Sequence, residues 1–241
     1  MIAVAEVELG AGVRAGFTSR RGGASLPPYD GLNLGDHVGD DPRAVARNRA
    51  LVSAWAGVDV VFATQVHGRG VVVLEAPPTG PVGEADALVS SDPSVAVGVV
   101  VADCVPLLLA DDAAGVVSAV HAGRPGLVAG VVQSALDAMV GVGARRDRVV
   151  AALGPCIAGA SYEVPAAMRD DVEQRVPGTA TTTAWGTPAL DLPAGVVAVL
   201  RAEGVGTVRA ATTDTWSDAD HYSYRRDGRT GRFAGVVRPL H

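Results

Sequence analysis

Cysteine, aromatic side chains and long apolar runs are all scarce in this chain of 241 residues, and each shortage excludes something. The two cysteines, Cys104 and Cys156, cannot form a disulfide framework, which predicts a protein of the reducing cytoplasm. The longest apolar runs are interrupted by aspartate well before they reach the length of a membrane span. The first residues lack a basic segment followed by an apolar one, so no secretory signal is expected.

Positive charge is also limited. Lysine and arginine together number 20 against 26 acidic residues, which gives a net charge of −6. This balance argues against a nucleic-acid backbone as the partner. Hydrophobic residues make up 48% of the chain but aromatic ones only 4%, so small aliphatic side chains dominate. That mixture favours an α/β core whose strands are covered on their faces, in one domain or at most two small ones.

The stretch from residue 96 to residue 140 carries the strongest pattern. Three short runs rich in valine and leucine, Val97–Val101, Val105–Ala110 and Val116–Val120, are separated by polar residues or glycine. They are too short for good helices and almost wholly apolar, which predicts three buried strands. After Gly126 the apolar residues recur at helical spacing until Gly141, which predicts a helix.

Residues capable of catalysis stand at the ends of these strands. Cys104 follows the first strand, and His121 ends the third, directly before an Ala-Gly pair. Strand ends that lead through a glycine-rich turn into a helix are where α/β folds commonly keep their chemistry. This stretch is therefore the candidate active site.

Two other segments carry local signals. Asp41 and Pro42 are typical of a helix N-cap and first helical residue, and Gly57 would end that helix after about Ala56. Residues 177–188 are rich in threonine, glycine and proline, which predicts an exposed loop.

His67, in a turn between two short predicted strands, joins Cys104 and His121 as a third reactive side chain. Imidazole and thiolate suit zinc or copper, and three ligands with an open fourth position are typical of catalytic zinc. Cys104 could instead be a nucleophile with His121 as its base. A third interpretation makes all three ordinary core residues. The separations of 37 and 17 residues match no zinc-finger pattern, so the residues alone leave these interpretations open.

Arg20 lies in a basic, glycine-rich loop, residues 19–25. Backbone N–H groups and guanidinium groups in such a loop can bind a phosphate or a carboxylate. A solvated turn without a ligand is the alternative.

Eight short motifs occur in an order that resembles one known family. They are FTSRRGG from Phe17, LNLGDHVGDDP from Leu32, TQVHG from Thr64, ADALV from Ala85, ADCVP from Ala102, VHAG from Val120, LGPCI from Leu153 and YRRDGRTGR from Tyr224. Together they are similar to the laccase-domain family, first called multicopper polyphenol oxidases. Its members are now described as purine nucleoside phosphorylases with additional adenosine deaminase activity.

The resemblance implies a single α/β domain over residues 1–241, with mixed sheets flanked by helices, and a zinc ion bound by His67, Cys104 and His121. It also implies phosphorolysis of adenosine, inosine, guanosine or methylthioadenosine to the free base and a sugar 1-phosphate, with adenosine deamination as a side activity. The expected partners are thus a nucleoside and phosphate in the cytoplasm, without nucleic acid or membrane.

Four further residues receive expected roles if this resemblance holds. Phosphorolysis needs a cationic cradle for phosphate, for which Arg20 is the candidate, and Asn33 could hydrogen-bond the sugar or the base. Asp86 and Asp103 are expected to orient a ligand histidine through its second ring nitrogen. For Asp103, a simple cap at the strand end is the alternative.

The chain departs from the family's pattern at two places. VHAG is followed by Arg124-Pro125 rather than Trp-Arg, and Asp214 stands where relatives often have cysteine. Copper-dependent phenol oxidation is not expected, because five histidines without a His-x-His pair cannot build the usual multicopper sites. The alternatives are a cysteine hydrolase or amidase that uses Cys104 and His121 on cell-wall precursors, and a non-catalytic zinc-binding partner protein.

Overall fold

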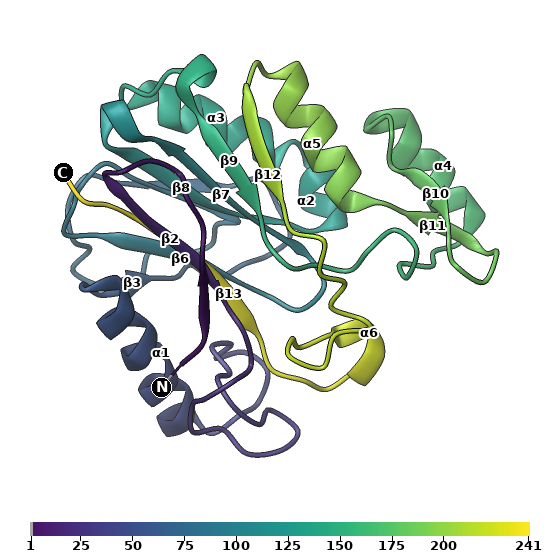
Figure 1. Cartoon of the computed structure of the whole chain (residues 1–241), viewed down its shortest axis with the longest axis horizontal. Helices are drawn as coiled ribbons and strands as arrows, with labels where there is room; N and C mark the ends of the chain where they lie inside the picture. Colours follow the sequence, from purple (N-terminus) through teal and green to yellow (C-terminus); the bar gives the residue numbers. More distant parts are fainter. Residues whose placement is uncertain (1) are drawn as a thin grey trace.

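The computed structural model describes residues 2–241, and two β-sheets lie face to face at its centre (Figure 1). The five-stranded sheet has the order β1 (Val4–Glu6), β2 (Val13–Thr18), β13 (Phe233–Pro239), β6 (Ala96–Val101) and β3 (Val60–Val61). The six-stranded sheet has the order β12 (Thr207–Ala210), β9 (Val150–Leu153), β7 (Val105–Asp111), β8 (Val116–Ala122), β5 (Ala87–Ser90) and β4 (Val71–Leu74). Both contain parallel and antiparallel pairs, which confirms the predicted fold class.

Strand β7 shows how the sequence produces two cores. Successive side chains of a strand point to opposite faces of the sheet. Leu108 and Ala110 accordingly pack between the two sheets, while Leu107 and Leu109 face the helices on the other side. All four are fully buried. The continuous apolar run at 105–110 is therefore the mark of a strand covered on both faces.

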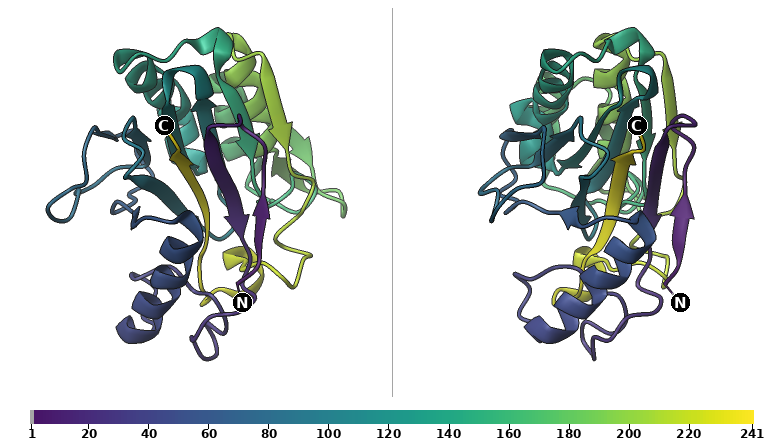
Figure 2. Two further views of the ribbon diagram at one scale, coloured as in Figure 1. Left: turned by 60° about the vertical axis from the view of Figure 1, so that its left-hand side comes forward. Right: turned by 90° about the vertical axis from the view of Figure 1, so that its left-hand side faces the viewer.

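Helices cover the outer face of each sheet. On the five-stranded sheet, α1 (Pro42–Ala56) packs Val52 and Ala56 against β6 and β13. The six-stranded sheet is covered by α2 (Arg124–Ala129), α3 (Val131–Gly141) and α5 (Leu192–Ala202). Figure 2 shows α1 and these helices on opposite sides of the paired sheets. The remaining helical segments are η1 (Asp112–Ala114), η2 (Arg146–Arg148), α4 (Ala166–Arg175) and α6 (Tyr224–Asp227). Within residues 2–241, none of the helices is both long and apolar enough to cross a membrane.

The α1 prediction is confirmed at both ends. The Asp41 side chain accepts a hydrogen bond from the N–H of Arg43, and Pro42 is the first helical residue. Gly57 ends the helix at a φ of 81°, in the left-handed region that glycine adopts without steric cost.

Two local predictions were wrong. The helix expected after Gly126 begins earlier, at Arg124, and is divided into α2 and α3 by Gly130, whose φ is 91°. Apolar spacing continues through this break, so periodicity did not reveal it. The segment 177–188 is not a simple loop, because β10 (Ala180–Thr182) pairs with β11 (Pro188–Leu190) as a hairpin. The two threonines of β10, Thr181 and Thr182, follow the β-propensity of that residue rather than its frequency in turns.

Candidate active site

His67, Cys104 and His121 meet at one end of the paired sheets, where their ligand atoms all lie within 4.8 Å of one another. His121 is in β8, and Cys104 immediately precedes β7. Because β7 and β8 pair with Pro106 opposite His121, the residues just before β7 lie at the same end of the sheet as His121. His67 comes from the turn between β3 and β4.

The Asp86 carboxylate holds the turn that carries His67. It is fully buried and accepts hydrogen bonds from the N–H groups of Val66, His67 and Gly68 at 3.2, 2.9 and 2.6 Å. His67 has a φ of 59°, in the left-handed region that is costly for a residue with a side chain. The three bonds offset that cost and fix the imidazole at the site.

Asp86 also orients the second histidine. Its Oδ1 lies 2.8 Å from Nδ1 of His121, and its carbonyl accepts the His121 backbone N–H at 2.7 Å. Nε2 is thus left free for the site, in the arrangement typical of a metal-bound histidine. Although burial by itself would raise the pKa of Asp86, the bonds from His121 and Gly68 hold it below its usual value.

Cys104 and His121 form a charge-coupled pair. Burial alone would raise the pKa of the Cys104 thiol, but the neighbouring His121 and His67 lower it to about 6. Burial would likewise lower the pKa of His121, but Cys104 and Asp86 raise it to about 9. The site therefore favours a thiolate, which is the form that binds metals and acts as a nucleophile.

The three donors fit a zinc ion. Sγ of Cys104 lies 3.8 Å from Nε2 of His67. A tetrahedral zinc with ordinary Zn–S and Zn–N bonds would separate such atoms by about 3.5 Å. One sulfur and two imidazole nitrogens on three separate segments also leave the fourth position open, as catalytic zinc sites do.

Gly123, the residue before α2, makes this close approach possible. A Cβ atom at this position would lie 2.7 Å from Cδ2 of His67 and 3.0 Å from Sγ of Cys104. Gly126 is needed for a similar reason, because a Cβ there would lie 2.8 Å from the carbonyl oxygen of Gly68. Because Gly123 and Gly126 have no side chain, the turn that carries His67 can pack against the start of α2.

The three donors open into a cavity of about 630 Å³. Three arginines line it: Arg124 at the start of α2, Arg225 in α6 and Arg232 just before β13. The guanidinium of Arg225 lies 5.1 Å from the ring centroid of Tyr162, and that of Arg232 lies 5.8 Å from the ring centroid of Tyr224. Both rings line the cavity too, beside Val100, Val101, Ile157 and Leu192.

Arg20 and Asn33 are not among the cavity-lining residues. The Arg20 guanidinium pairs with Asp30 at 2.8 Å and lies 4.9 Å from the centroid of the Tyr222 ring, so its charge already has a carboxylate partner. Asn33 is fully buried, and its side chain bonds to Gly35 and Asp40 and accepts the N–H of Arg232. Neither position supports the predicted phosphate or nucleoside contact.

Asp103 makes no hydrogen bond to either histidine ring, contrary to one of its predicted roles. Its carboxylate accepts hydrogen bonds from the Thr215 hydroxyl and the Arg225 N–H, both at 2.7 Å. Asp214, the departure in the tail, accepts bonds from the Ala158 N–H and the Ser161 hydroxyl, so it braces the loop between the cavity-lining residues Ile157 and Tyr162.

The site residues expected from the sequence did not include four that line the cavity: Arg225, Arg232, Tyr162 and Tyr224. A signal for three of them was present, because the YRRDGRTGR motif gathers arginine and tyrosine in one short polar segment. Nothing local to that segment shows which of its side chains enter the cavity.

Comparison with known proteins places this site in a family. Residues 14–239 match the family described as multi-copper polyphenol oxidoreductase laccase. A purine nucleoside phosphorylase of Streptomyces coelicolor is 51% identical over 230 residues, covering 94% of this chain and 95% of that protein. A purine nucleoside phosphorylase of Mycobacterium tuberculosis is 49% identical over 228 residues, covering 93% and 91%.

Solved structures agree with that placement. The crystal structure of a Neisseria meningitidis protein superimposes with a TM-score of 0.91 at 37% identity and covers 100% of this chain and 99% of that one. YlmD from Geobacillus stearothermophilus gives a TM-score of 0.88 at 29% identity and covers 96% and 93%. The chain belongs to the multi-copper polyphenol oxidoreductase laccase family.

Proposed function

We propose that this protein is a zinc-dependent purine nucleoside phosphorylase. The observation that carries the proposal is one cavity that combines a His-Cys-His metal site with three arginines. The names of relatives at 49 and 51% identity support the same activity. Both cysteines are free thiols in the structure, which suits the reducing cytoplasm in which we place the reaction.

Phosphate would bind to the arginines of the cavity. The chain contains no lysine, so its anion sites depend on guanidinium groups and backbone N–H groups. Arg232 donates to the carbonyls of Thr230 and Gly231, and burial lowers its pKa, because its charge is partly removed from water. Within residues 2–241, the ion pairs include none of Arg124, Arg225 and Arg232. An oxyanion would supply the charged partner that these groups lack.

The nucleoside would occupy the apolar part of the same cavity. Tyr162 and Tyr224 offer flat faces to a purine, and Val100, Val101 and Ile157 exclude water around it. A phosphate oxygen would form a bond to C1′ of the ribose as the bond from C1′ to the purine nitrogen breaks. The electron pair goes to the purine, which takes up the proton that phosphate gives up. The arginines hold the phosphate on the ribose and stabilise charge in the transition state.

The metal site adjoins the substrate cavity. Zinc held by His67, Cys104 and His121 would supply a Lewis acid beside the bound substrate. One thiolate and two imidazoles suit zinc, and the structure gathers too few histidines there for a multicopper centre. Adenosine deamination is the second activity we propose, with water in place of phosphate: water adds at C6 of the purine and ammonia leaves, giving inosine.

A cysteine hydrolase is the second candidate function, because one observation favours it. The Cys104 sulfur lies within 4.8 Å of the His121 ring nitrogen, Asp86 bonds to Nδ1 of that ring, and the pKa of the thiol is lowered. That arrangement also describes a nucleophile, its base and the group that orients the base. The hydrolase would act without metal, whereas the phosphorylase requires the three residues as ligands.

The deciding experiment supplies inosine and inorganic phosphate to the zinc-loaded protein while oxygen is monitored. We expect hypoxanthine and ribose 1-phosphate in equal amounts, no oxygen uptake, and loss of turnover after chelation of zinc. Free ribose in place of ribose 1-phosphate, or activity that survives chelation and depends on Cys104, would favour the hydrolase. Oxygen uptake with phenols that requires added copper would overturn the proposal.

A further inference from the structure

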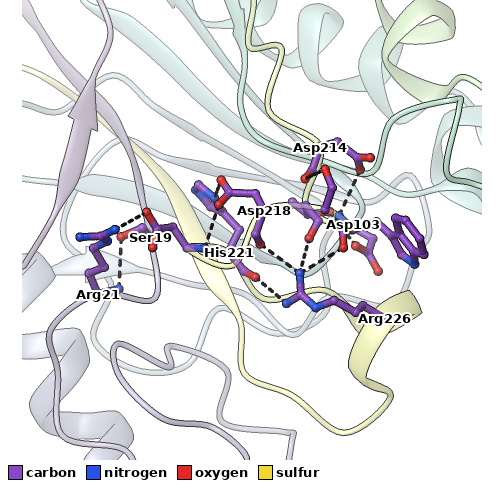
Figure 3. Close-up of polar contacts among 11 residues, drawn as sticks. Ser19, Arg21, Asp103, Asp214, Asp218, His221 and Arg226 are labelled. Carbon is purple, nitrogen blue, oxygen red and sulfur yellow. Dashed lines mark hydrogen bonds and ion pairs between the residues drawn. The ribbon is translucent and has the colours of Figure 1, made fainter.

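The Arg226 side chain hydrogen-bonds to several backbone carbonyls of one loop, residues 215–221. Its guanidinium donates to the carbonyls of Thr215 at 2.8 Å, Asp218 at 3.0 Å and His221 at 3.0 Å, with a longer bond of 3.3 Å to Trp216. Figure 3 shows the Arg226 guanidinium between Asp218 and His221 on one side and Asp103 on the other. The planar guanidinium of Arg226 therefore holds residues 215–221 in one conformation through these hydrogen bonds.

A hydroxyl group of this loop, that of Thr215, hydrogen-bonds to the Asp103 carboxylate. Thr215 is fully buried, and its hydroxyl donates to Oδ1 of Asp103 at 2.7 Å. The other oxygen of Asp103, Oδ2, accepts the backbone N–H of Arg225 at the start of α6, also at 2.7 Å. Both carboxylate oxygens are thus engaged by residues more than 110 positions further along the chain.

Asp103 is itself in an unfavourable backbone conformation. Its φ is 90°, and it immediately precedes Cys104. In addition to the two hydrogen bonds of its side chain, Asp103 accepts a hydrogen bond at its backbone carbonyl from the Ile157 N–H at 2.9 Å. Strained residues persist where the surroundings determine their conformation, and such residues cluster at active sites. The contacts therefore hold the turn that points Cys104 into the cavity.

Arg225 is fixed at its other end as well. Its guanidinium donates to the carbonyl of Glu163 at 2.9 Å and stacks on Tyr162. With its N–H bound to Asp103, Arg225 cannot shift along the cavity without breaking one of these contacts. Asp103 consequently connects the backbone of a cavity arginine to the residue next to a metal ligand.

We propose that Asp103 is a positioning residue that sets the placement of the Arg225 guanidinium relative to Cys104, and that Arg226 supports it through Thr215. The inference rests on the proposed function, in which Arg225 binds phosphate and Cys104 binds zinc. Metal and phosphate are then held at a constant separation by one carboxylate that touches neither of them. This role differs from the orientation of a histidine, which Asp86 performs.

Thr215→Val tests this role with little change of shape. It removes the hydroxyl and leaves Oδ1 of Asp103 buried without its donor, which is costly for a carboxylate. We expect both the Kd of inorganic phosphate, measured by calorimetry, and the KM for phosphate to rise about tenfold. The KM for inosine should stay within about twofold of wild type, since Thr215→Val leaves every side chain that lines the cavity unchanged. Thr215→Ser retains the hydroxyl and should restore the wild-type values.

Asp103→Asn provides a second variant. Asparagine tolerates a positive φ, but its amide offers one oxygen where the turn needs two acceptors. We expect the same selective loss of phosphate binding, together with weaker zinc binding in competition with a chromogenic chelator. Arg226→Lys should act in the same direction, because an ammonium group cannot reach all the carbonyls that the guanidinium joins.

The outcomes separate this inference from the proposed function. Phosphate binding that is unchanged in all three variants, or equal losses for phosphate and inosine that Thr215→Ser does not restore, would overturn the positioning role. Wild-type protein that binds phosphate but performs no phosphorolysis would overturn the proposed function alone. Wild-type protein that binds no phosphate would overturn both.

Discussion

The carboxylate of Asp86 serves both histidines of the site: it bonds to Nδ1 of His121 at 2.8 Å and to the backbone N–H of His67 at 2.9 Å. Neither the strand that carries His121 nor the turn that carries His67 would set their relative orientation alone. The two rings meet edge to face, with centroids 4.6 Å apart. One buried carboxylate therefore places two of the three proposed metal ligands.

Asp86→Asn should weaken zinc binding by about ten- to a hundredfold, as expected when the partner of a ligand histidine is lost. It should also destabilise the metal-free protein at neutral pH by about 1–3 kcal/mol, because an amide cannot accept all four hydrogen bonds. Zinc competition and urea unfolding measure the two effects. The exposed Asp59 provides the control: Asp59→Asn should change neither quantity.

The pH dependence of this stability difference follows from the lowered pKa of Asp86. The stability that the carboxylate contributes is fully present above its unfolded pKa of about 4. It is lost as the pH falls through the lower folded pKa, because the unfolded state takes up a proton first. In metal-free protein, the difference between wild type and Asp86→Asn should therefore narrow below about pH 4. A difference that widens in acid would contradict the assignment of Asp86 as an ionised acceptor.

Cys104→Ser should abolish most zinc binding, while wild type carries about one equivalent per chain. The hydroxyl of serine is a poor substitute for thiolate, and the remaining two imidazoles would hold the metal weakly. Metal analysis of the purified proteins measures this. Cys156→Ala is the matched control, since Cys156 is buried in the core among aliphatic side chains. Full zinc occupancy in Cys104→Ser would remove Cys104 from the ligand set.

Gly123→Ala should reduce zinc affinity although no ligand is changed. The added Cβ would lie 2.7 Å from the His67 ring and 3.0 Å from the Cys104 sulfur, so the ligands must move apart. Gly141→Ala, where a Cβ meets no atom within 4 Å, is the control and should bind zinc as wild type does. Equal zinc affinities for the two variants would show that the site tolerates wider spacing than the structure indicates.

Arg232→Ala should raise the KM for phosphate by about ten- to a hundredfold, the cost of one or two charge-assisted hydrogen bonds. Arg20→Ala should leave the KM for phosphate within about twofold of wild type, because the Arg20 guanidinium is committed to Asp30 outside the cavity lining. Initial rates at saturating inosine measure both. A large rise in the KM for phosphate in Arg20→Ala, with no change in Arg232→Ala, would show that phosphate binds at the loop 19–25 and not in the cavity.

Local features of this protein could be predicted from its sequence. The limits of α1 follow from Asp41, Pro42 and Gly57, whose effects act within one turn of the helix. The buried strands β6, β7 and β8 follow from apolar runs of strand length. The family could be identified because its motifs recur in order along the chain. Even the selection of His67, Cys104 and His121 needed only their residue types, their strand-end positions and that resemblance.

Contacts between distant segments could be decided only by the tertiary structure. Arg20 has the charge and the glycine neighbours of an anion site, yet Asp30 and Tyr222 occupy its guanidinium. In the sequence, Arg225 and Arg232 are two of several arginines in a polar tail. In the structure, β13 lies in the middle of the five-stranded sheet, and this position brings both arginines into the same cavity as Cys104. Asp103 resembles a strand cap in the sequence, but its partners are Thr215 and Arg225. Side-chain partners of this kind depend on how the sheets are ordered and packed, and a local sequence pattern contains no record of that order.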